Sequence, residues 1–169
     1  MSIIWKIDNL LNSITMYRLV LYGLIFLAIV ASIFGFLNWL PFSGVQLLET
    51  LAVILLSSYT SNKFFAKVFK ANTNVESWWI TAFILFLVLA PIAGLTDLWV
   101  TIAVSLISMA SKYLLVVDKK HFFNPAAFGM FIAGLFGFGN SIWWVGSVTL
   151  LPFVLIVGLL VVRKIRRFQ

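Results

Sequence analysis

The sequence predicts an all-α fold, a polytopic bundle of about six transmembrane helices. Three observations predict it. Of the 169 residues, 63% are hydrophobic and only 10% are charged, which is too apolar for a soluble domain of this size. The apolar residues form runs close to the roughly 20 residues that a helix needs to cross a bilayer. The lysines and arginines occur only in every second separator between these runs.

The first predicted element, residues 1–16, is an amphipathic helix lying on the cytoplasmic surface of the membrane. Ile3, Ile7 and Leu10 recur at helical spacing, and Lys6 lies on the polar side of the same helix. An apolar face beside a charged face is typical of a helix that lies in the membrane interface.

The rest of the chain, residues 17–169, is predicted to be one transmembrane domain. Its separators are short and rich in proline, glycine, asparagine and serine, so consecutive helices should be antiparallel neighbours. The predicted spans are residues 17–38, 44–62, 77–93, 97–116, 124–138 and 142–162.

The basic residues predict the orientation of the spans. Lysine and arginine accumulate in cytoplasmic segments of membrane proteins. Here the alternate separators carry none of them, so an even number of spans with both termini in the cytoplasm fits the whole sequence. Although the net charge is +7, the basic residues stand singly or in small groups at the ends of apolar runs, which favours a lipid bilayer over a nucleic acid as partner. The residues concerned are Lys6, Arg18, Lys63, Lys67, Lys70, Lys112, Lys119, Lys120, Arg163, Lys164, Arg166 and Arg167.

The fifth span is short and begins with Asn124, Pro125 and Ala126. Asparagine is a good N-cap and proline suits the first helical position, so we expect the helix to start here. Two interpretations remain open. The unpaired N–H groups of a half-helix end can face an anionic or carbonyl-bearing ligand, as in transporters. Alternatively, the pair simply caps a short helix whose glycines allow close packing.

Three further polar residues are candidates for function. Glu49 lies inside the second span and either binds a cation or relays protons, or reaches water at the outer interface. Lys112 either neutralises a phosphate-bearing partner or extends to the membrane surface. His121 could sense pH or touch an anionic headgroup. With one histidine and no cysteine, the sequence predicts no metal site, and no pattern of catalytic residues is present.

Two parts of the second half resemble a known family. The first comprises Ser111-Lys112-Tyr113-Leu114 and Lys120 to Gly129, with the segment Phe-Asn-Pro-Ala. The second comprises Trp144 to Ser147 and the basic end Val162 to Arg167. These segments resemble the D subunit of Rnf electron-transport complexes and the B subunit of the sodium-pumping NADH:quinone oxidoreductase.

The resemblance implies an inverted-repeat, urea-transporter-like fold of which this chain would form a part. It also implies a membrane subunit that couples electron transfer to ion transport in the bacterial cytoplasmic membrane, so any enzyme would be the whole oxidoreductase. The expected partners are other electron-transport subunits or a reductase domain. Lys112, His121, Asn124, Pro125 and Ala126 become candidate residues for binding a flavin or another ligand.

One departure concerns the cofactor. The family attaches flavin covalently through a threonine in a Ser-Gly-Ala-Thr loop, whereas here Gly139-Asn140-Ser141 leads directly into the next span. No covalent attachment residue is therefore identified, and FMN or riboflavin is expected to bind noncovalently.

The sequence thus supports three functions. The first is a membrane subunit of a flavin-linked electron-transport system. The second is a channel or transporter for a small solute or ion on a related scaffold. The third is the membrane anchor of a longer oxidoreductase.

Overall fold

A computed structural model describes residues 3–71, 75–117, 120–121, 123–138 and 142–165. It is all-α apart from one small antiparallel hairpin, in which Val116 pairs with His121. The elements are α1 (Ile3–Ser13), α2 (Met16–Phe36), α3 (Gly44–Val68), α4 (Val75–Val88), α5 (Leu95–Leu114), β1 (Val116–Val117), β2 (Lys120–His121), α6 (Pro125–Leu135), the 3-10 helix η1 (Trp144–Gly146) and α7 (Leu151–Lys164).

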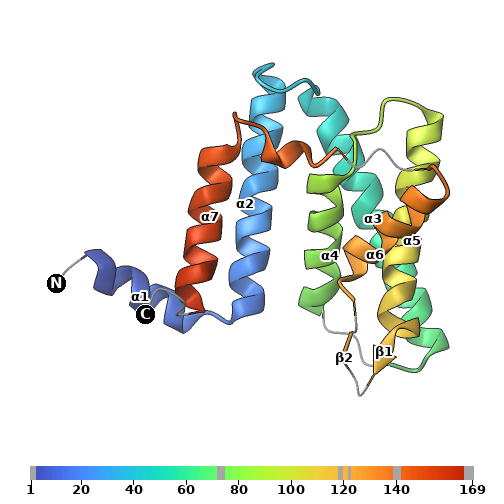
Figure 1. The fold of residues 1–169 in the computed structure, drawn as a ribbon, viewed down its shortest axis with the longest axis horizontal. Coiled ribbons are helices and arrows are strands. Elements are labelled where there is room, and N and C mark those ends of the chain that lie inside the picture. The colour runs from blue at the N-terminus through green and yellow to red at the C-terminus, as the bar shows by residue number, and fades with distance from the viewer. Residues whose placement is uncertain (1–2, 72–74, 118–119, 122, 139–141, 166–169) are drawn as a thin grey trace.

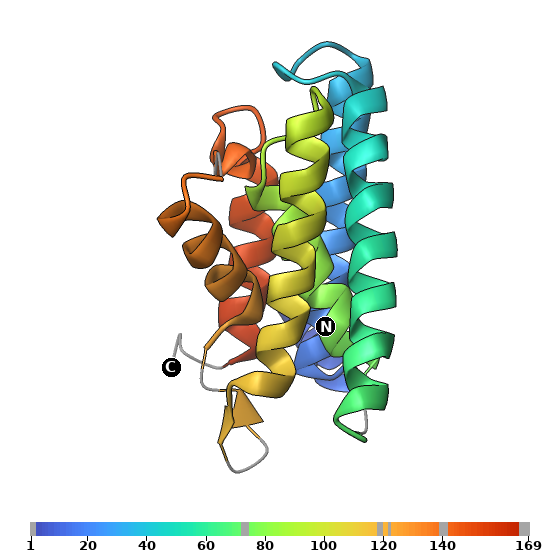
Figure 2. The same cartoon turned by 90° about the vertical axis from the view of Figure 1, so that its right-hand side faces the viewer.

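Helices α2 to α7 run alternately up and down, as the short separators predict, while α1 lies across the end of α7 (Figure 1). Figure 2 shows α5 between α3 and α6, and α5 packs against both of these helices. Helices α2 and α7 form a neighbouring pair, with α2 also contacting α3 and α4. The carboxylate of Asp8 in α1 binds Arg163 of α7 at 2.7 Å, so both ends of the described chain lie at one end of the bundle.

Polar side chains define where three of the helices begin. The Thr15 hydroxyl accepts the N–H of Arg18 at the start of α2. Ser43 and Gln46 form a reciprocal capping box at the start of α3. Asn124 caps α6 with Pro125 in the first turn, which confirms the predicted start of this helix.

Prolines and glycine explain where the helices differ from the predicted spans. Helix α4 ends at Val88 rather than at residue 93, because Pro91 disfavours helical backbone in the residue before it. Helix α7 begins at Leu151 rather than at residue 142, because Pro152 is tolerated only in a first turn. Helix α6 ends at Leu135, where Gly137 adopts a φ of +69° and closes the helix end.

Two helices in the described parts of the chain, α2 with 21 residues and α5 with 20, are long and apolar enough to cross a membrane. Helices α4 and α6 are apolar but shorter. Helix α3 has 25 residues, about 37 Å, and is less apolar because it carries Gln46, Glu49 and Asn62.

Candidate functional site

The buried side of α5 is lined by hydroxyl groups. Thr101, Ser105, Ser108 and Ser111 follow one another at intervals of four, three and three residues, which places them on one face of the helix. Ser105 and Ser108 are fully buried, and Thr101 and Ser111 nearly so. We call these four residues the hydroxyl face.

Two members of this face, like Ser58 in α3, lack the hydrogen bonds that several other buried hydroxyls of the bundle make. Ser32, Thr81 and Ser111 each donate to a carbonyl of their own helix, at 2.8 to 3.0 Å. The Oγ atoms of Ser105 and Ser108, and that of Ser58 in α3, are buried without a hydrogen-bond partner among the described residues. A buried hydroxyl with no partner costs free energy, so it points to a binding partner such as water or a small polar molecule.

Helix α3 is held against α5 near both of its ends. Near one end, the Thr50 hydroxyl accepts the N–H of Ile92 at 2.9 Å, just before α5 begins. Near the other end, the Tyr113 hydroxyl donates to the side-chain oxygen of Asn62 at 2.9 Å. These two contacts fix the register of the two helices. Ser58 is buried and lies in α3 between the residues that make them, Thr50 and Asn62.

Helix α6 closes the other side of the hydroxyl face. Gly129 is buried against α5, and a Cβ atom added to it would overlap the Oγ of Ser108 and approach the carbonyl of Val104. Glycine is therefore required for this close approach of two helices.

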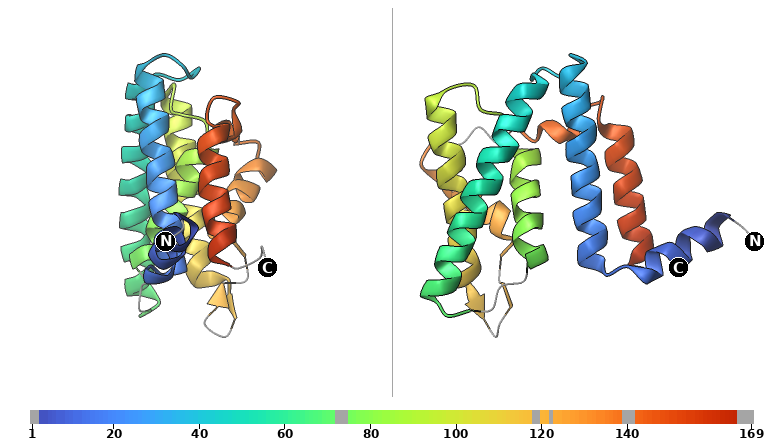
Figure 3. Two further views of the ribbon diagram at one scale, coloured as in Figure 1. Left: turned by 90° about the vertical axis from the view of Figure 1, so that its left-hand side faces the viewer. Right: turned by 180° about the vertical axis from the view of Figure 1, so that it is seen from behind.

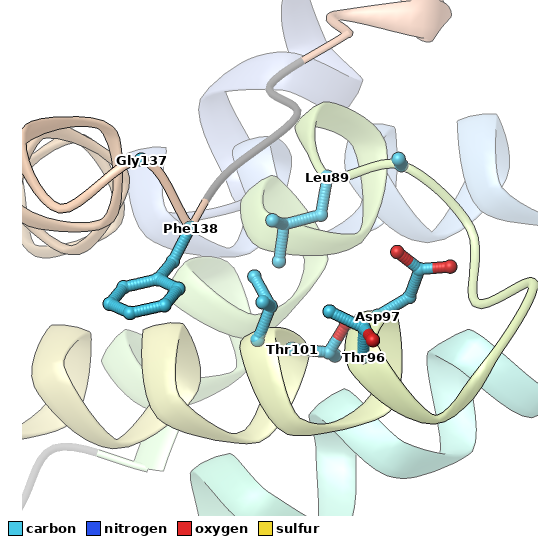
Figure 4. Close-up of a pocket in the computed structure, with 8 residues that line it drawn as sticks. Leu89, Thr96, Asp97, Thr101, Gly137 and Phe138 are labelled. Atoms are coloured by element: carbon cyan, nitrogen blue, oxygen red, sulfur yellow. The ribbon is translucent and has the colours of Figure 1, made fainter.

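A small pocket lies at the end of the hydroxyl face where α5 begins. It has a volume of about 140 Å³, and Thr96, Asp97 and Thr101 line it together with Leu89 and Phe138 (Figure 4). The carboxylate of Asp97 accepts the N–H of Ala93 at 3.0 Å, so it also stabilises the start of α5. Thr101 belongs both to this pocket and to the hydroxyl face.

Lys112 lies at the opposite end of the hydroxyl face. Only 6% of this residue is exposed, and its Nζ donates to the carbonyl and hydroxyl oxygens of Ser77 in α4, at 2.7 and 3.1 Å. The side chain thus turns inward to α4 rather than extending to the surface. Its hydrogen bonds in the described structure go to neutral oxygens.

The other predicted site residues are Glu49, His121, Asn124, Pro125 and Ala126. Glu49 is exposed and projects from the side of α3 opposite its buried residues. The Asn124 side chain accepts the N–H groups of Ala126 at 3.0 Å and of Ala127 at 3.4 Å. It therefore caps the N-terminus of its own helix, α6. Pro125 occupies the first turn of α6 and Ala126 is buried. The backbone of His121 lies in β2, and its side chain is outside the described residues.

A second pocket, of about 370 Å³, lies beside η1. Pro41, Phe42, Trp143 and Trp144 give it aromatic and apolar walls, and Ser147 lies at its edge. The Oγ of Ser147 is buried and has no partner among the described residues. The Trp144 indole N–H donates to the carbonyls of Phe86 and Leu89, at 3.2 and 2.9 Å, which anchors the pocket to the end of α4.

Sequence reasoning missed the hydroxyl face, although a signal was present. Serine and threonine at helical spacing within an apolar span indicate a polar stripe. No group of three or more histidine, cysteine, aspartate or glutamate side chains that could bind a metal ion occurs in the described residues.

Comparison with known protein families, with curated proteins and with solved structures finds no match for this chain.

Proposed function

We propose that this chain is an integral membrane protein that crosses the bilayer six times, with both ends in the cytoplasm. The apolar lengths of α2 and α5 support this arrangement. So does the polarity of the bundle, since large apolar side chains such as Leu48, Leu56 and Leu155 are exposed while serines and threonines are buried. Water would not favour that distribution, whereas lipid around a polar interior would.

The proposed activity is the passage of a small uncharged polar solute along the hydroxyl face of α5. The unpartnered hydroxyls of Ser105 and Ser108 are the observation that carries this proposal. A hydroxyl group both donates and accepts hydrogen bonds, so a row of them can replace the hydration of a small polar molecule step by step. The row covers about ten residues, or about 15 Å of helix, and begins at the pocket beside Asp97.

The charge of Lys112 favours an uncharged solute over a cation. This lysine stands at the other end of the hydroxyl face, and its described hydrogen bonds go to the neutral oxygens of Ser77. When this lysine is protonated, its positive charge beside a narrow path raises the electrostatic barrier for cations, as in channels that exclude them.

Helix α6 is the element that would have to move. The contact of Gly129 with Ser108 closes the hydroxyl face as described, so passage requires α6 to separate from α5. With 11 residues, α6 is about 16 Å long, about half the thickness of a bilayer core, so the chain between α6 and α7 has to complete this crossing. Short, interrupted helices around a central site are typical of transporters.

The proposal is tested by reconstituting the purified chain into liposomes and measuring their swelling in urea, formamide and glycerol gradients. Swelling faster than in protein-free liposomes of the same lipid is expected for at least one solute. Glu49→Gln is the matched control, because Glu49 lies on the far side of α3 and its replacement should leave the swelling rate unchanged. Equal swelling with and without protein would contradict the proposal.

The aromatic pocket beside η1 favours a second candidate, the flavin-linked electron-transport subunit implied by the family resemblance. Its walls include Trp143 and Trp144, and aromatic rings can stack on a planar cofactor. Its lining includes Trp144, Gly146 and Ser147, which belong to the segment resembling the one that follows the flavin-bearing loop in that family. An absorption spectrum of protein purified from cells supplied with riboflavin tests this candidate: acid-releasable flavin would support it, and a colourless protein would oppose it.

A further inference from the structure

A groove between α2 and α7 forms an apolar binding surface on the outside of the bundle. The two helices lie side by side (Figure 3) and approach closely at Gly23, where an added Cβ atom would lie 2.5 Å from Cγ1 of Val157. Beside this contact the groove has a volume of about 300 Å³. Its walls include Leu19, Gly23 and Phe26 of α2 with Val157, Leu160 and Val161 of α7.

The shape and lining of the groove suit a hydrocarbon chain. It follows α2 from Leu19 to Phe26, which is about 10 Å of helix. The Tyr22 hydroxyl is the only polar side-chain group among the residues that line it. An acyl chain lying here would cover apolar surface on both helices without leaving a hydrogen-bonding group unpaired.

The end of the groove nearest α1 is basic. Arg18 immediately precedes Leu19 in α2, and Arg163 and Lys164 follow Val161 in α7. Arg163 binds Asp8 through two hydrogen bonds, of 2.7 and 2.9 Å, and Lys164 donates to the carbonyl of Leu11. Among the described side chains, three cations and two carboxylates, those of Asp8 and Glu76, therefore lie at this end.

Arg18 is the best placed of these side chains to bind an anion. Its side chain is 56% exposed and, among the described residues, it bonds Glu76 through Nε alone, at 2.9 Å. The two terminal amino groups of its guanidinium can therefore donate to a phosphate. Basic pockets between transmembrane helices on the cytoplasmic side are suited to anionic lipid headgroups.

We propose that the groove between α2 and α7 binds an anionic phospholipid of the cytoplasmic leaflet. One acyl chain lies along Gly23 and Val157, and the phosphate lies between Arg18 and Lys164. This inference rests on the membrane-spanning arrangement proposed above but not on solute passage.

Electron paramagnetic resonance of reconstituted protein with spin-labelled lipids tests the site. Spin-labelled phosphatidylglycerol should show a larger motionally restricted fraction than spin-labelled phosphatidylcholine, by roughly fivefold in relative affinity for each basic side chain engaged. The double variant Arg18→Gln/Lys164→Gln should lower this preference towards one. The control Lys63→Gln/Lys67→Gln changes two lysines near the same membrane face, at the end of α3, and should keep most of the preference.

A groove-filling variant, Leu160→Trp, separates headgroup attraction from chain binding. It should lower the restricted fraction of phosphatidylglycerol while circular dichroism shows that the helices persist. Equal affinities for the two lipids in the unmodified protein would overturn the lipid site, as would a preference that the Arg18→Gln/Lys164→Gln variant retains in full. Absence of any restricted lipid would instead contradict the membrane-spanning arrangement itself.

Discussion

The hydroxyl oxygen of Ser108 in α5 lies directly against Gly129 of α6. It is the atom that a Cβ at Gly129 would meet first. The contact joins the two main features of the molecule, a helix with a buried row of hydroxyls and a short helix that covers it.

Replacing Gly129 with alanine should destabilise the protein. The new methyl group would overlap Ser108, and overpacking of this kind costs about 1–3 kcal/mol. Denaturant unfolding followed by circular dichroism in detergent measures the change. Adding Ser108→Ala should recover part of the loss but not all of it, because the Val104 carbonyl would remain 2.9 Å from the new methyl group. Equal stabilities of Gly129→Ala and the unmodified protein would show that α6 packs elsewhere.

Trp144→Phe should weaken the contact between η1 and the end of α4. The indole N–H bonds the carbonyls of Phe86 and Leu89, and phenylalanine keeps the ring but removes this donor. A loss of roughly 1–3 kcal/mol in the free energy of unfolding is expected, because buried carbonyls lose a partner. Trp99→Phe is the control, since Trp99 is 67% exposed and should change stability little. Similar changes in the free energy of unfolding for the two substitutions would contradict the hydrogen bonds described for Trp144.

The topology can be mapped with introduced cysteines, because the chain has none of its own. Ala93 and Ala71 are both exposed and lie in separators at opposite ends of the bundle. Six crossings with cytoplasmic termini predict that Ala93→Cys reacts with an impermeant maleimide in intact cells, whereas Ala71→Cys reacts only after permeabilisation. Labelling of both positions, or of the opposite one, in intact cells would contradict this orientation.

The sequence predicted much of this fold because its main elements depend on local signals. The apolar runs and the Asn124-Pro125 cap sufficed to locate most helices. The predicted start of α7 was wrong because the apolar run begins before Pro152. Hydropathy alone does not show that proline is disfavoured in the interior of a helix.

The candidate site was harder to predict. Glu49 was a candidate because it is a charged residue in an apolar span, but it lies on the exposed side of α3. Ser105 and Ser108 are ordinary residues in sequence, and their importance lies in having no partner once α3, α5 and α6 pack together. That property depends on tertiary contacts, which composition and periodicity do not specify. The direction of Lys112 likewise depends on where α4 places Ser77.

Lys112→Gln should admit cations to the proposed path. The substitution removes the positive charge that the protonated lysine places at the end of the hydroxyl face, while the glutamine amide can still donate to Ser77. Potassium flux into liposomes should rise above that of the unmodified protein, and Lys112→Arg, which keeps the charge, should not raise it. Unchanged potassium flux in Lys112→Gln would show that Lys112 does not exclude cations.

Solute flux and stability measured together in Ser105→Ala/Ser108→Ala test the central claim most directly. Alanine removes two buried hydroxyls that have no partner in the described structure, so the free energy of unfolding should stay the same or rise. If these hydroxyls bind the passing solute, its flux should fall roughly thirtyfold, because two lost hydrogen bonds of about 1 kcal/mol each amount to about 2 kcal/mol. Flux equal to that of the unmodified protein, in a variant that remains folded, would contradict the proposed pathway along α5.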